Sequence, residues 1–258
     1  VQAISMDPNY ADSYNNLANL LNDMGRHEEA LSKLEKSLEL RPDFPEVYNN
    51  RANAYRKLGM VSVAIADYQK AIKLKPDYID AYSNLGGILG DSGEHESAIE
   101  NYEKALALKP DFFVFYKLGL LLATLGRWDE CKVKFEMSVQ CKNDFPDSQF
   151  RLGHSCYKLK QDDLAVRYLH KALEVDPNHS QSLNCLGLIF HVQNKFEKAL
   201  AFFDKAIQID PETAIYHSNR ALALIELNQA KRALADFKKG LEIDPKRVEI
   251  LINMGDLY

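Results

Sequence analysis

The feature that most constrains the fold of this chain is an internal repeat with a step of about 34 residues. Proline marks this step at Pro8, Pro42, Pro76, Pro110, Pro177, Pro211 and Pro245, and Asn143 takes its place where the step shortens by one residue. A small residue keeps the same step at Ala30, Ala64, Ala98, Cys131, Ala165, Ala199 and Ala233. Because a repeat of this length accommodates two short helices and their turns, the pattern predicts a series of similar helical hairpins.

Two further columns of residues keep the same register. A large apolar residue follows each small one by four positions, at Leu34, Tyr68, Tyr102, Phe135, Leu169, Phe203 and Phe237. A second small residue comes earlier in each repeat, at Ala18, Ala52, Gly86, Gly119, Gly153, Gly187, Ala221 and Gly255. Small side chains are needed where two helices cross closely, and the large ones fill the space between neighbouring hairpins. No segment alternates with period two, so we predict no β-sheet.

Turn residues mark the ends of the predicted helices. Glycine or asparagine stands between the two helices of most repeats, where a left-handed backbone conformation is expected, at Gly25, Gly59, Gly93, Gly126, Asn194 and Asn228. Lys160 takes this place in one repeat and should be strained there. The residue after the proline position is predicted to cap the next helix, at Asn9, Asp43, Asp77, Asp111, Asp144 and Asn178. Three residues later stands a predicted capping-box partner, at Asp12, Glu46, Asp80, Asp147 or Gln181.

Taken together, these columns resemble the tetratricopeptide repeat family over the whole chain. The resemblance implies an all-α fold, a right-handed superhelical α-solenoid of antiparallel helix pairs. We expect a single solenoid over residues 1–258, with complete repeats at 11–44, 45–78, 79–111, 112–145, 146–179, 180–213 and 214–247 and partial repeats at 1–10 and 248–258. Neither end carries a polar capping helix, so the chain is expected to be a fragment of a longer protein.

Composition narrows the class of function. The chain is 46% hydrophobic and 27% charged with a formal net charge of -5, and it contains no apolar run long enough to span a membrane. This mild acidity argues against nucleic-acid binding. Cys131, Cys141, Cys156 and Cys185 show no metal-ligand spacing and indicate reduced thiols. We therefore expect a cytoplasmic protein, with the nucleus or the cilium as alternatives, that needs no cofactor or metal and binds proteins without being an enzyme.

The predicted binding surface is the first helix of each repeat, which lines the inner face of the superhelix in tetratricopeptide proteins. One column there, the ladder column, consists of Asn16, Asn50, Asn84, Lys117, Arg151, Cys185, Asn219 and Asn253. It resembles the asparagine ladder of O-linked N-acetylglucosamine transferases, in which an amide bonds a peptide backbone through both donors and acceptors. The resemblance implies a partner protein or peptide bound in extended form or as a helix, within a multi-protein complex. Polar residues on a solvated helix face are the alternative interpretation.

Other candidate residues flank the ladder column. Asn19 and Asn53 belong to an amide-rich stretch near the N-terminus that also includes Asn15 and Asn49. The middle repeats add Tyr116, Phe150, His154, Tyr157 and Lys158, and aromatic residues beside arginine or lysine are typical of binding hot spots. We predict that Lys117 and Arg151 anchor an acidic or aromatic segment of the partner. The alternative interpretation assigns several of these aromatic residues to the core between helices.

The sequence leaves several other functions to be weighed. A clamp for a C-terminal carboxylate is disfavoured because Asp12, Glu46 and Asp80 occupy the positions where such clamps carry lysine. An alternative is the substrate-recognition arm of an enzyme resembling O-linked N-acetylglucosamine transferase, with the catalytic domain outside this chain. A ciliary or transport scaffold is another. A helical-repeat RNA reader is less compatible, since the base-reading positions of such proteins require basic side chains.

Overall fold

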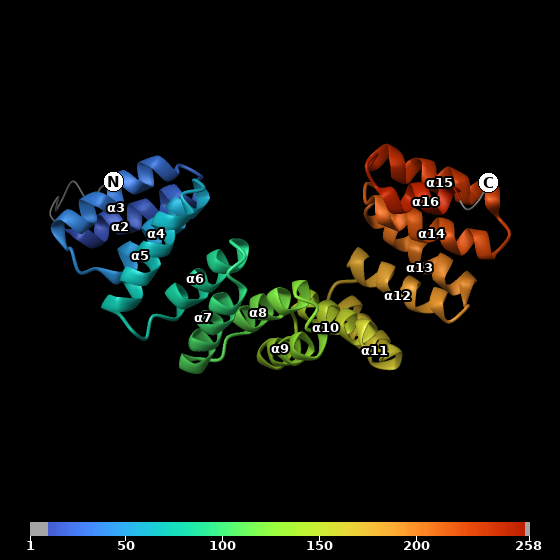
Figure 1. Ribbon diagram of the computed structural model, residues 1–258, viewed down its shortest axis with the longest axis horizontal. Coiled ribbons are helices and arrows are strands. Elements are labelled where there is room, and N and C mark those ends of the chain that lie inside the picture. Colours follow the sequence, from blue (N-terminus) through green and yellow to red (C-terminus); the bar gives the residue numbers. More distant parts are fainter. Residues whose placement is uncertain (1–9, 256–258) are drawn as a thin grey trace. The chain divides into compact units, whose positions relative to one another are not determined.

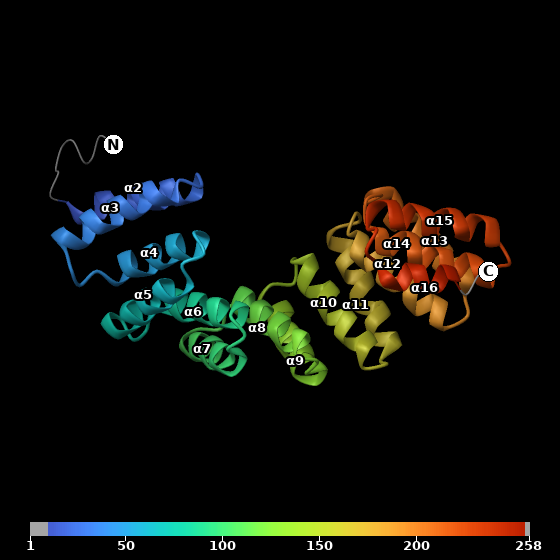
Figure 2. The same cartoon turned by 45° about the horizontal axis from the view of Figure 1, so that its top comes forward.

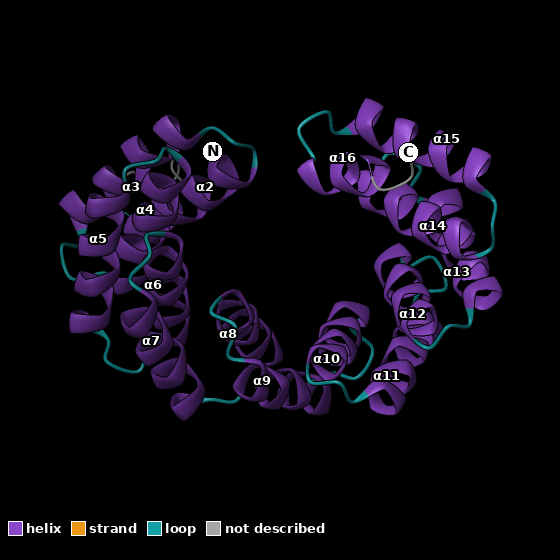
Figure 3. Ribbon diagram, turned by 45° about the vertical axis from the view of Figure 1, so that its right-hand side comes forward, coloured by secondary structure: helices purple, strands orange, loops and turns teal. Residues whose placement is uncertain are grey.

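The computed structural model describes residues 10–255, and all the regular secondary structure in this range is α-helix (Figures 1 and 3). It divides into two compact units, which we call unit 1 (residues 1–121) and unit 2 (residues 122–258). The first seven described helices are α2 (Ala11–Asp23), α3 (His27–Leu40), α4 (Pro45–Lys57), α5 (Val61–Leu74), α6 (Ile79–Asp91), α7 (His95–Leu108) and α8 (Phe112–Thr124). The others are α9 (Trp128–Cys141), α10 (Pro146–Lys158), α11 (Asp162–Val175), α12 (Ser180–Val192), α13 (Phe196–Ile209), α14 (Ala214–Glu226), α15 (Ala230–Ile243) and α16 (Val248–Gly255).

The helices pack as consecutive hairpins, each made of a first and a second helix. Unit 1 contains the hairpins α2–α3, α4–α5 and α6–α7, and unit 2 contains α10–α11, α12–α13 and α14–α15 (Figure 2). Helix α3 also packs against α4, α5 against α6, α11 against α12 and α13 against α14, and α15 contacts α16. Within each unit, first helices contact each other directly, as α4 does α6 and α12 does α14. The prediction of an all-α array of helix pairs is confirmed.

The predicted columns of small and large residues form the core. All seven members of the second-helix small column have no exposed surface, at Ala30, Ala64, Ala98, Cys131, Ala165, Ala199 and Ala233. Tyr68, Phe203 and Phe237 are likewise fully buried. A Cβ atom added at Gly187 would lie 2.4 Å from the Phe203 ring, which explains why this helix crossing requires glycine.

The turns within the hairpins adopt the backbone conformation that the sequence predicts. Gly25, Gly59, Gly93 and Gly126 have φ angles between 72° and 85°. Lys160, Asn194 and Asn228 have φ angles of 57° or 58° and are the described non-glycine residues with positive φ. Asparagine tolerates this region because its short polar side chain can bond locally. Lys160 lacks that compensation, so the predicted strain at this turn is present.

The predicted helix caps are wrong at most positions. Asp111 does cap, since its carboxylate accepts the backbone N–H groups of Phe113 and Val114 at 2.9 and 3.0 Å. Elsewhere the N-cap is one residue after the predicted one, at Phe44, Tyr78, Phe145 and His179, in place of Asp43, Asp77, Asp144 and Asn178. Of these only His179 accepts a hydrogen bond through its side chain, from the Ser182 N–H. Asn9 lies outside the described residues.

Two of the predicted capping-box acids instead form ion pairs within their own repeat. Asp12 pairs with Arg41 at 3.2 Å, and Glu46 pairs with Lys75 at 3.1 Å. In both pairs the basic residue lies in the loop after the hairpin, so it can reach the acid in the first turn of the first helix. The pairs are partly exposed to solvent, and each contributes at most about 1 kcal/mol to stability.

The predicted repeats cover the whole chain, including a partial repeat at each end. Residues 1–9, which fall in the first predicted partial repeat, lie outside the described part of the chain. Residues 248–255 form α16, where the second partial repeat was predicted. The single right-handed superhelix over residues 1–258 stays a prediction.

Candidate functional site

Three ladder asparagines form side-chain hydrogen bonds with an asparagine that stands next to the ladder position of the preceding repeat. In three places the side-chain Nδ2 of a ladder asparagine donates to the Oδ1 of an asparagine on the preceding first helix. These pairs are Asn50 to Asn15 at 2.8 Å, Asn84 to Asn49 at 3.0 Å and Asn219 to Asn184 at 2.8 Å. The acceptor stands one position before the ladder position of its own repeat. We call these contacts the amide pairs.

The amide pairs fix the orientation of the ladder side chains. Neighbouring first helices touch in each unit, which brings side chains 35 residues apart within bonding distance. Each ladder asparagine in a pair uses one N–H group internally and keeps a second one. The carbonyl oxygen of Asn50 also accepts the Nδ2 group of Asn49 at 3.4 Å. The Oδ1 atom of Asn84 accepts no hydrogen bond from the residues that the structure describes. Its carbonyl is therefore an unused acceptor beside a pocket.

Three ladder positions depart from asparagine. Lys117 lies 3.4 Å from the Ser83 hydroxyl and 4.8 Å from the centre of the Phe113 ring, through its Nζ atom. Burial, followed by the nearby charge of Arg56, lowers the pKa of Lys117. Cys185 is 3% exposed, and burial raises the pKa of its thiol to about 12, so it is an unreactive thiol. Arg151 is half-buried, with its guanidinium 5.3 Å from the centre of the Phe150 ring.

Unit 1 contains two pockets between first helices. One, of about 480 Å³, lies between α2 and α4 and is lined by Asn19, Asn22, Asp23, His27, Asn50, Asn53, Arg56 and Lys57. The other, of about 420 Å³, is lined by Asn49, Asn53, Ile79, Asp80, Ser83, Asn84, Asp111, Phe113, Val114 and Lys117. Asn53 borders both pockets, so the two lie next to each other on the same helix faces. Asparagine supplies four of the eight lining residues of the first pocket and three of the ten of the second.

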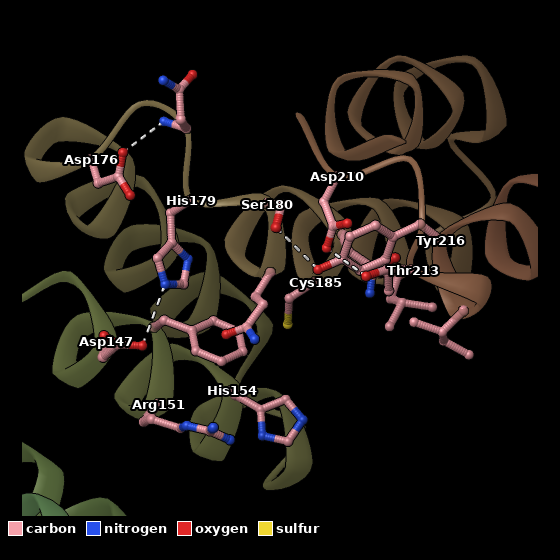
Figure 4. A pocket seen from close by; sticks show the side chains of 16 residues that line it. Asp147, Arg151, His154, Asp176, His179, Ser180, Cys185, Asp210, Thr213 and Tyr216 are labelled. Atoms are coloured by element: carbon pink, nitrogen blue, oxygen red, sulfur yellow. Dashed lines mark hydrogen bonds and ion pairs between the residues drawn. The ribbon is translucent and has the colours of Figure 1, made fainter. Parts of the chain in front are cut away.

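Unit 2 contains a larger pocket of about 570 Å³, which we call the unit-2 pocket (Figure 4). It is lined by α10, α12 and α14 together with the loops that precede α12 and α14. Its residues are Asp147, Phe150, Arg151, His154, Asp176, Asn178, His179, Ser180, Gln181, Asn184, Cys185, Leu188, Asp210, Thr213, Ile215 and Tyr216. The lining combines one arginine, aromatic walls, amides and three aspartates.

Hydrogen bonds hold the loop side of this pocket in place. The Nδ1 atom of His179 accepts the Ser182 N–H at 3.2 Å, while its Nε2 atom lies 3.6 Å from Asp147. The hydroxyl groups of Ser180 and Tyr216 lie 3.2 Å apart. In Figure 4 these contacts lie along one side of the pocket, while Arg151 and His154 lie together away from them. The pocket is thus rigid along its loop side.

The electrostatic environment near Arg151 is positive. Burial, with smaller contributions from the charges of Lys158 and Arg151, lowers the pKa of His154 to about 4. His154 is therefore neutral at physiological pH. Its ring lies 5.9 Å from that of Trp128 and 6.0 Å from that of Phe150. Lys158 sits above Trp128, with its Nζ atom 5.8 Å from the ring centre.

The structure brings some of the predicted site residues to these pockets and not others. Those that line one of the three pockets are Asn19, Asn50, Asn53, Asn84, Lys117, Phe150, Arg151 and His154. Those that line none of the three are Asn16, Tyr116, Tyr157, Lys158, Asn219 and Asn253. Asn219 is 7% exposed and Phe150 is also 7% exposed, so the core interpretation applies to part of the set. Tyr116 stacks on Phe113, with ring centres 6.2 Å apart.

Several pocket residues were missed by the sequence analysis. His179, Ser180, Gln181 and Tyr216 come from loops and first turns, where no repeating column points to binding. Asn184 could have been found, because it stands one position before the ladder column as Asn15 and Asn49 do. The repeat register alone was sufficient to identify it.

Neither metal ligation nor membrane insertion is indicated in residues 10–255. No group of three or more histidine, cysteine or acidic side chains lies close enough together there to hold a metal ion. None of the helices in this range has the length and apolar character needed to cross a bilayer.

Solved structures with similar folds contain helical repeats. YrrB, described as a tetratricopeptide protein with an unusual peptide-binding site, is 25% identical, and the match covers 76% of this chain and 97% of YrrB with a TM-score of 0.62. The Cut9–Hcn1 hetero-tetramer of APC/C matches at 16% identity over 98% of this chain and 50% of the other, with a TM-score of 0.73. A repeat protein from Cytophaga hutchinsonii matches at 21% identity over 92% and 97%, with a TM-score of 0.70.

Family models give the assignment directly. No curated protein matches the sequence at a significant level. Models of the tetratricopeptide repeat match residues 9–75, 43–111, 146–179, 180–213 and 214–247, which together are well over half of the chain. With the repeating helix pairs and buried columns described above, these matches show that the chain belongs to the tetratricopeptide repeat family.

Proposed function

We propose that this chain binds an extended peptide segment of another protein along the first helices of its hairpins. Tetratricopeptide domains bind proteins or peptides, and YrrB is described as having a peptide-binding site. The observation that carries the proposal is the set of amide pairs beside the pockets. An extended peptide presents N–H and C=O groups at regular intervals, and pre-oriented amides can bond them without reading the peptide's side chains.

Asparagine side chains that are already oriented in the free protein should raise its affinity for a peptide. A free asparagine side chain loses rotamer freedom when it binds, and an immobilised side chain costs about 0.5–1.5 kcal/mol in an interface. The amide pairs impose this order before the partner arrives, as the 2.8 Å bond between Asn50 and Asn15 illustrates. The groove therefore offers donors and acceptors that are already in place.

The amide pair of Asn50 and Asn15 provides a test with a matched control. Asn50 lines a pocket, whereas Asn15 is 7% exposed and lines none of the three pockets. Asn50→Ala and Asn15→Ala remove the same internal hydrogen bond, but only Asn50→Ala removes a pocket amide. We expect Asn50→Ala to weaken binding of peptides selected from a random library of capped 12-residue peptides about five- to tenfold.

The measurement is fluorescence anisotropy with the selected peptides, and circular dichroism checks that both variants keep their helices. Asn15→Ala should weaken binding less, by about two- to threefold, because Asn50 loses its fixed orientation while the partner loses no contact. If the wild-type chain retains no peptide, or if both variants lose affinity equally, the proposed function is wrong.

A further inference from the structure

The guanidinium group of Arg151 lacks the partner that the other well-packed arginines have. Arg51 holds Asp67 through two hydrogen bonds of 2.7 and 2.9 Å, and Arg220 holds Asp236 through bonds of 2.7 and 2.6 Å. Arg151 forms no ion pair within 4.0 Å with any described residue, and its Nε atom is buried without a hydrogen-bond partner. Half-buried arginines are normally matched by a carboxylate. The unit-2 pocket therefore contains an unmatched cation.

The three aspartates of the pocket are already engaged elsewhere. Asp147 lies 3.6 Å from the Nε2 atom of His179. Asp176 accepts the backbone N–H of Asn178 at 2.9 Å, and Asp210 accepts the hydroxyl of Thr213 at 2.5 Å. All three stand in the first turn of a first helix or in the loop before one, and none of them reaches Arg151. The acidic loop side of the pocket thus consists of Asp147, Asp176 and Asp210, and Arg151 lies one helical turn after Asp147 on α10.

The environment of Arg151 also has room for apolar groups. Leu188 and Ile215 are half-buried pocket residues, and the rings of Phe150 and Tyr216 form buried walls. Asn184 uses its Oδ1 atom in an amide pair, which leaves its Nδ2 group to donate. A ligand here would meet one cation, one amide donor and two half-buried aliphatic side chains.

We propose that the unit-2 pocket is an anchor for one acidic side chain of the bound peptide, with its carboxylate on Arg151 and an adjacent aliphatic side chain against Leu188 and Ile215. The inference rests on the proposed function, since it assumes that a peptide lies along the first helices. Guanidinium binds a carboxylate through two parallel hydrogen bonds, which adds a defined geometry to the attraction between the charges.

The acidic loop side limits how much negative charge the peptide can carry. Asp147, Asp176 and Asp210 would lie near residues that flank the anchoring acid, where further carboxylates would be repelled. The pocket therefore selects a single aspartate or glutamate in an otherwise neutral or basic segment. A run of acidic residues should bind less well than one.

The first experiment is a positional-scanning library of capped nine-residue peptides, each with one position fixed, applied to the wild-type chain. We expect aspartate and glutamate to be enriched at one position, with leucine, isoleucine or valine enriched beside it. Four variants of a selected peptide then follow: one glutamate, glutamine in its place, aspartate in its place, and glutamate at three consecutive positions. The single acids should bind about tenfold more tightly than the glutamine and triple-glutamate peptides.

Substitution of Arg151 assigns the effect to the pocket. Arg151→Gln should lower affinity for the single-glutamate peptide about tenfold and leave affinity for the glutamine peptide unchanged. Arg151→Lys keeps the charge without the two-point geometry. Its affinity for the single-glutamate peptide should lie between those of the wild type and Arg151→Gln. Arg167→Gln is the matched control, because Arg167 is exposed on α11 and lines none of the three pockets. It should bind all four peptides as the wild type does.

The outcomes separate this inference from the proposed function. If the wild-type chain selects peptides without enrichment of acids, the acidic anchor is wrong while peptide binding stands. The same holds if Arg151→Gln and Arg151→Lys weaken the glutamate and glutamine peptides equally. If the wild-type chain selects no peptide, both proposals are wrong.

Discussion

At the scale of single residues, burial in unit 2 opposes protonation of the His154 imidazole. Its imidazole lies among Trp128, Phe150 and Tyr157, with ring centres 5.9, 6.0 and 6.5 Å away. This burial is the main cause that lowers its pKa to about 4, and the neighbouring cations add to it. A histidine in the unfolded chain has a pKa near 6.5. The folded state therefore holds His154 neutral over a pH range in which the unfolded chain would be protonated.

This shift predicts a loss of stability in mild acid. The contribution of His154 is present above pH 6.5 and is lost as the pH falls toward 4, because only the unfolded state binds the proton in that range. Between pH 7 and pH 5 the wild type should lose about 1–2 kcal/mol of unfolding free energy more than His154→Gln. Urea denaturation at the two pH values, followed by circular dichroism, measures the difference. Equal losses in both proteins would contradict the assigned cause.

The residue scale is also where sequence reasoning was least complete. The burial of Ala30 or Phe203 follows from a column that every repeat shares, so the register identifies it. A cap depends on where the backbone first turns, and a shift of one residue moved the caps from Asp43 and Asp77 to Phe44 and Tyr78. The repeating pattern does not determine the first residue of a helix to within one position.

At the scale of elements, buried ion pairs tie together the two helices of certain hairpins. Arg220 on α14 contacts Asp236 on α15 through two hydrogen bonds and also Asp204 on α13 at 2.8 Å. Asp236 is only 7% exposed. Hydrogen bonding to Asp236 is the largest cause that raises the pKa of Arg220, so the arginine stays charged. Arg51 and Asp67 repeat the arrangement between α4 and α5.

Removing one member of the pair should cost more than removing both. Arg220→Leu leaves the carboxylate of Asp236 buried without its cation and should lower the unfolding free energy by roughly 3–5 kcal/mol. The double variant Arg220→Leu, Asp236→Leu should recover most of that loss, since no uncompensated charge remains. Thermal and urea denaturation of the single and double variants provide the comparison. A double variant no more stable than Arg220→Leu would mean that the pair matters for packing alone.

Elements were the level that the sequence predicted best. Their type, order and turns follow from period, proline spacing and the glycine column, all of which reflect local backbone preferences. The pairing of elements into hairpins follows from short turns. The sequence did not predict which side chains on neighbouring first helices contact each other. The partner of Asn84 proved to be Asn49, and that depends on packing distances.

At the scale of the whole molecule, each hairpin depends on its neighbours for burial. The hairpin α12–α13 packs against α11 on one side and α14 on the other. Among the described residues, α2–α3 packs only against α4, and α16 exposes Leu251 and Ile252 by 47% and 59%. Repeat arrays of this kind gain stability from nearest-neighbour interfaces, so stability should vary along the chain.

Native-state hydrogen exchange should reveal this variation. We expect backbone amides in α12 and α13 to exchange at least about tenfold more slowly than those in α2 and α16, because helices with one covered side open more easily. Mass spectrometry of peptic fragments measures the rates for each helix. Uniform protection from α2 to α16 would show that the chain unfolds as one cooperative body.

The amide pair at Asn84 has a consequence for which segments the chain can accept. Its Nδ2 group is turned toward Asn49, which leaves the carbonyl oxygen to meet the visiting backbone. Among the backbone groups of the partner only an N–H can donate to that oxygen, and proline is the one residue without a backbone N–H. A partner segment with proline opposite Asn84 would leave this oxygen without a hydrogen bond, so the chain should bind such segments more weakly. Proline one residue to either side should be tolerated.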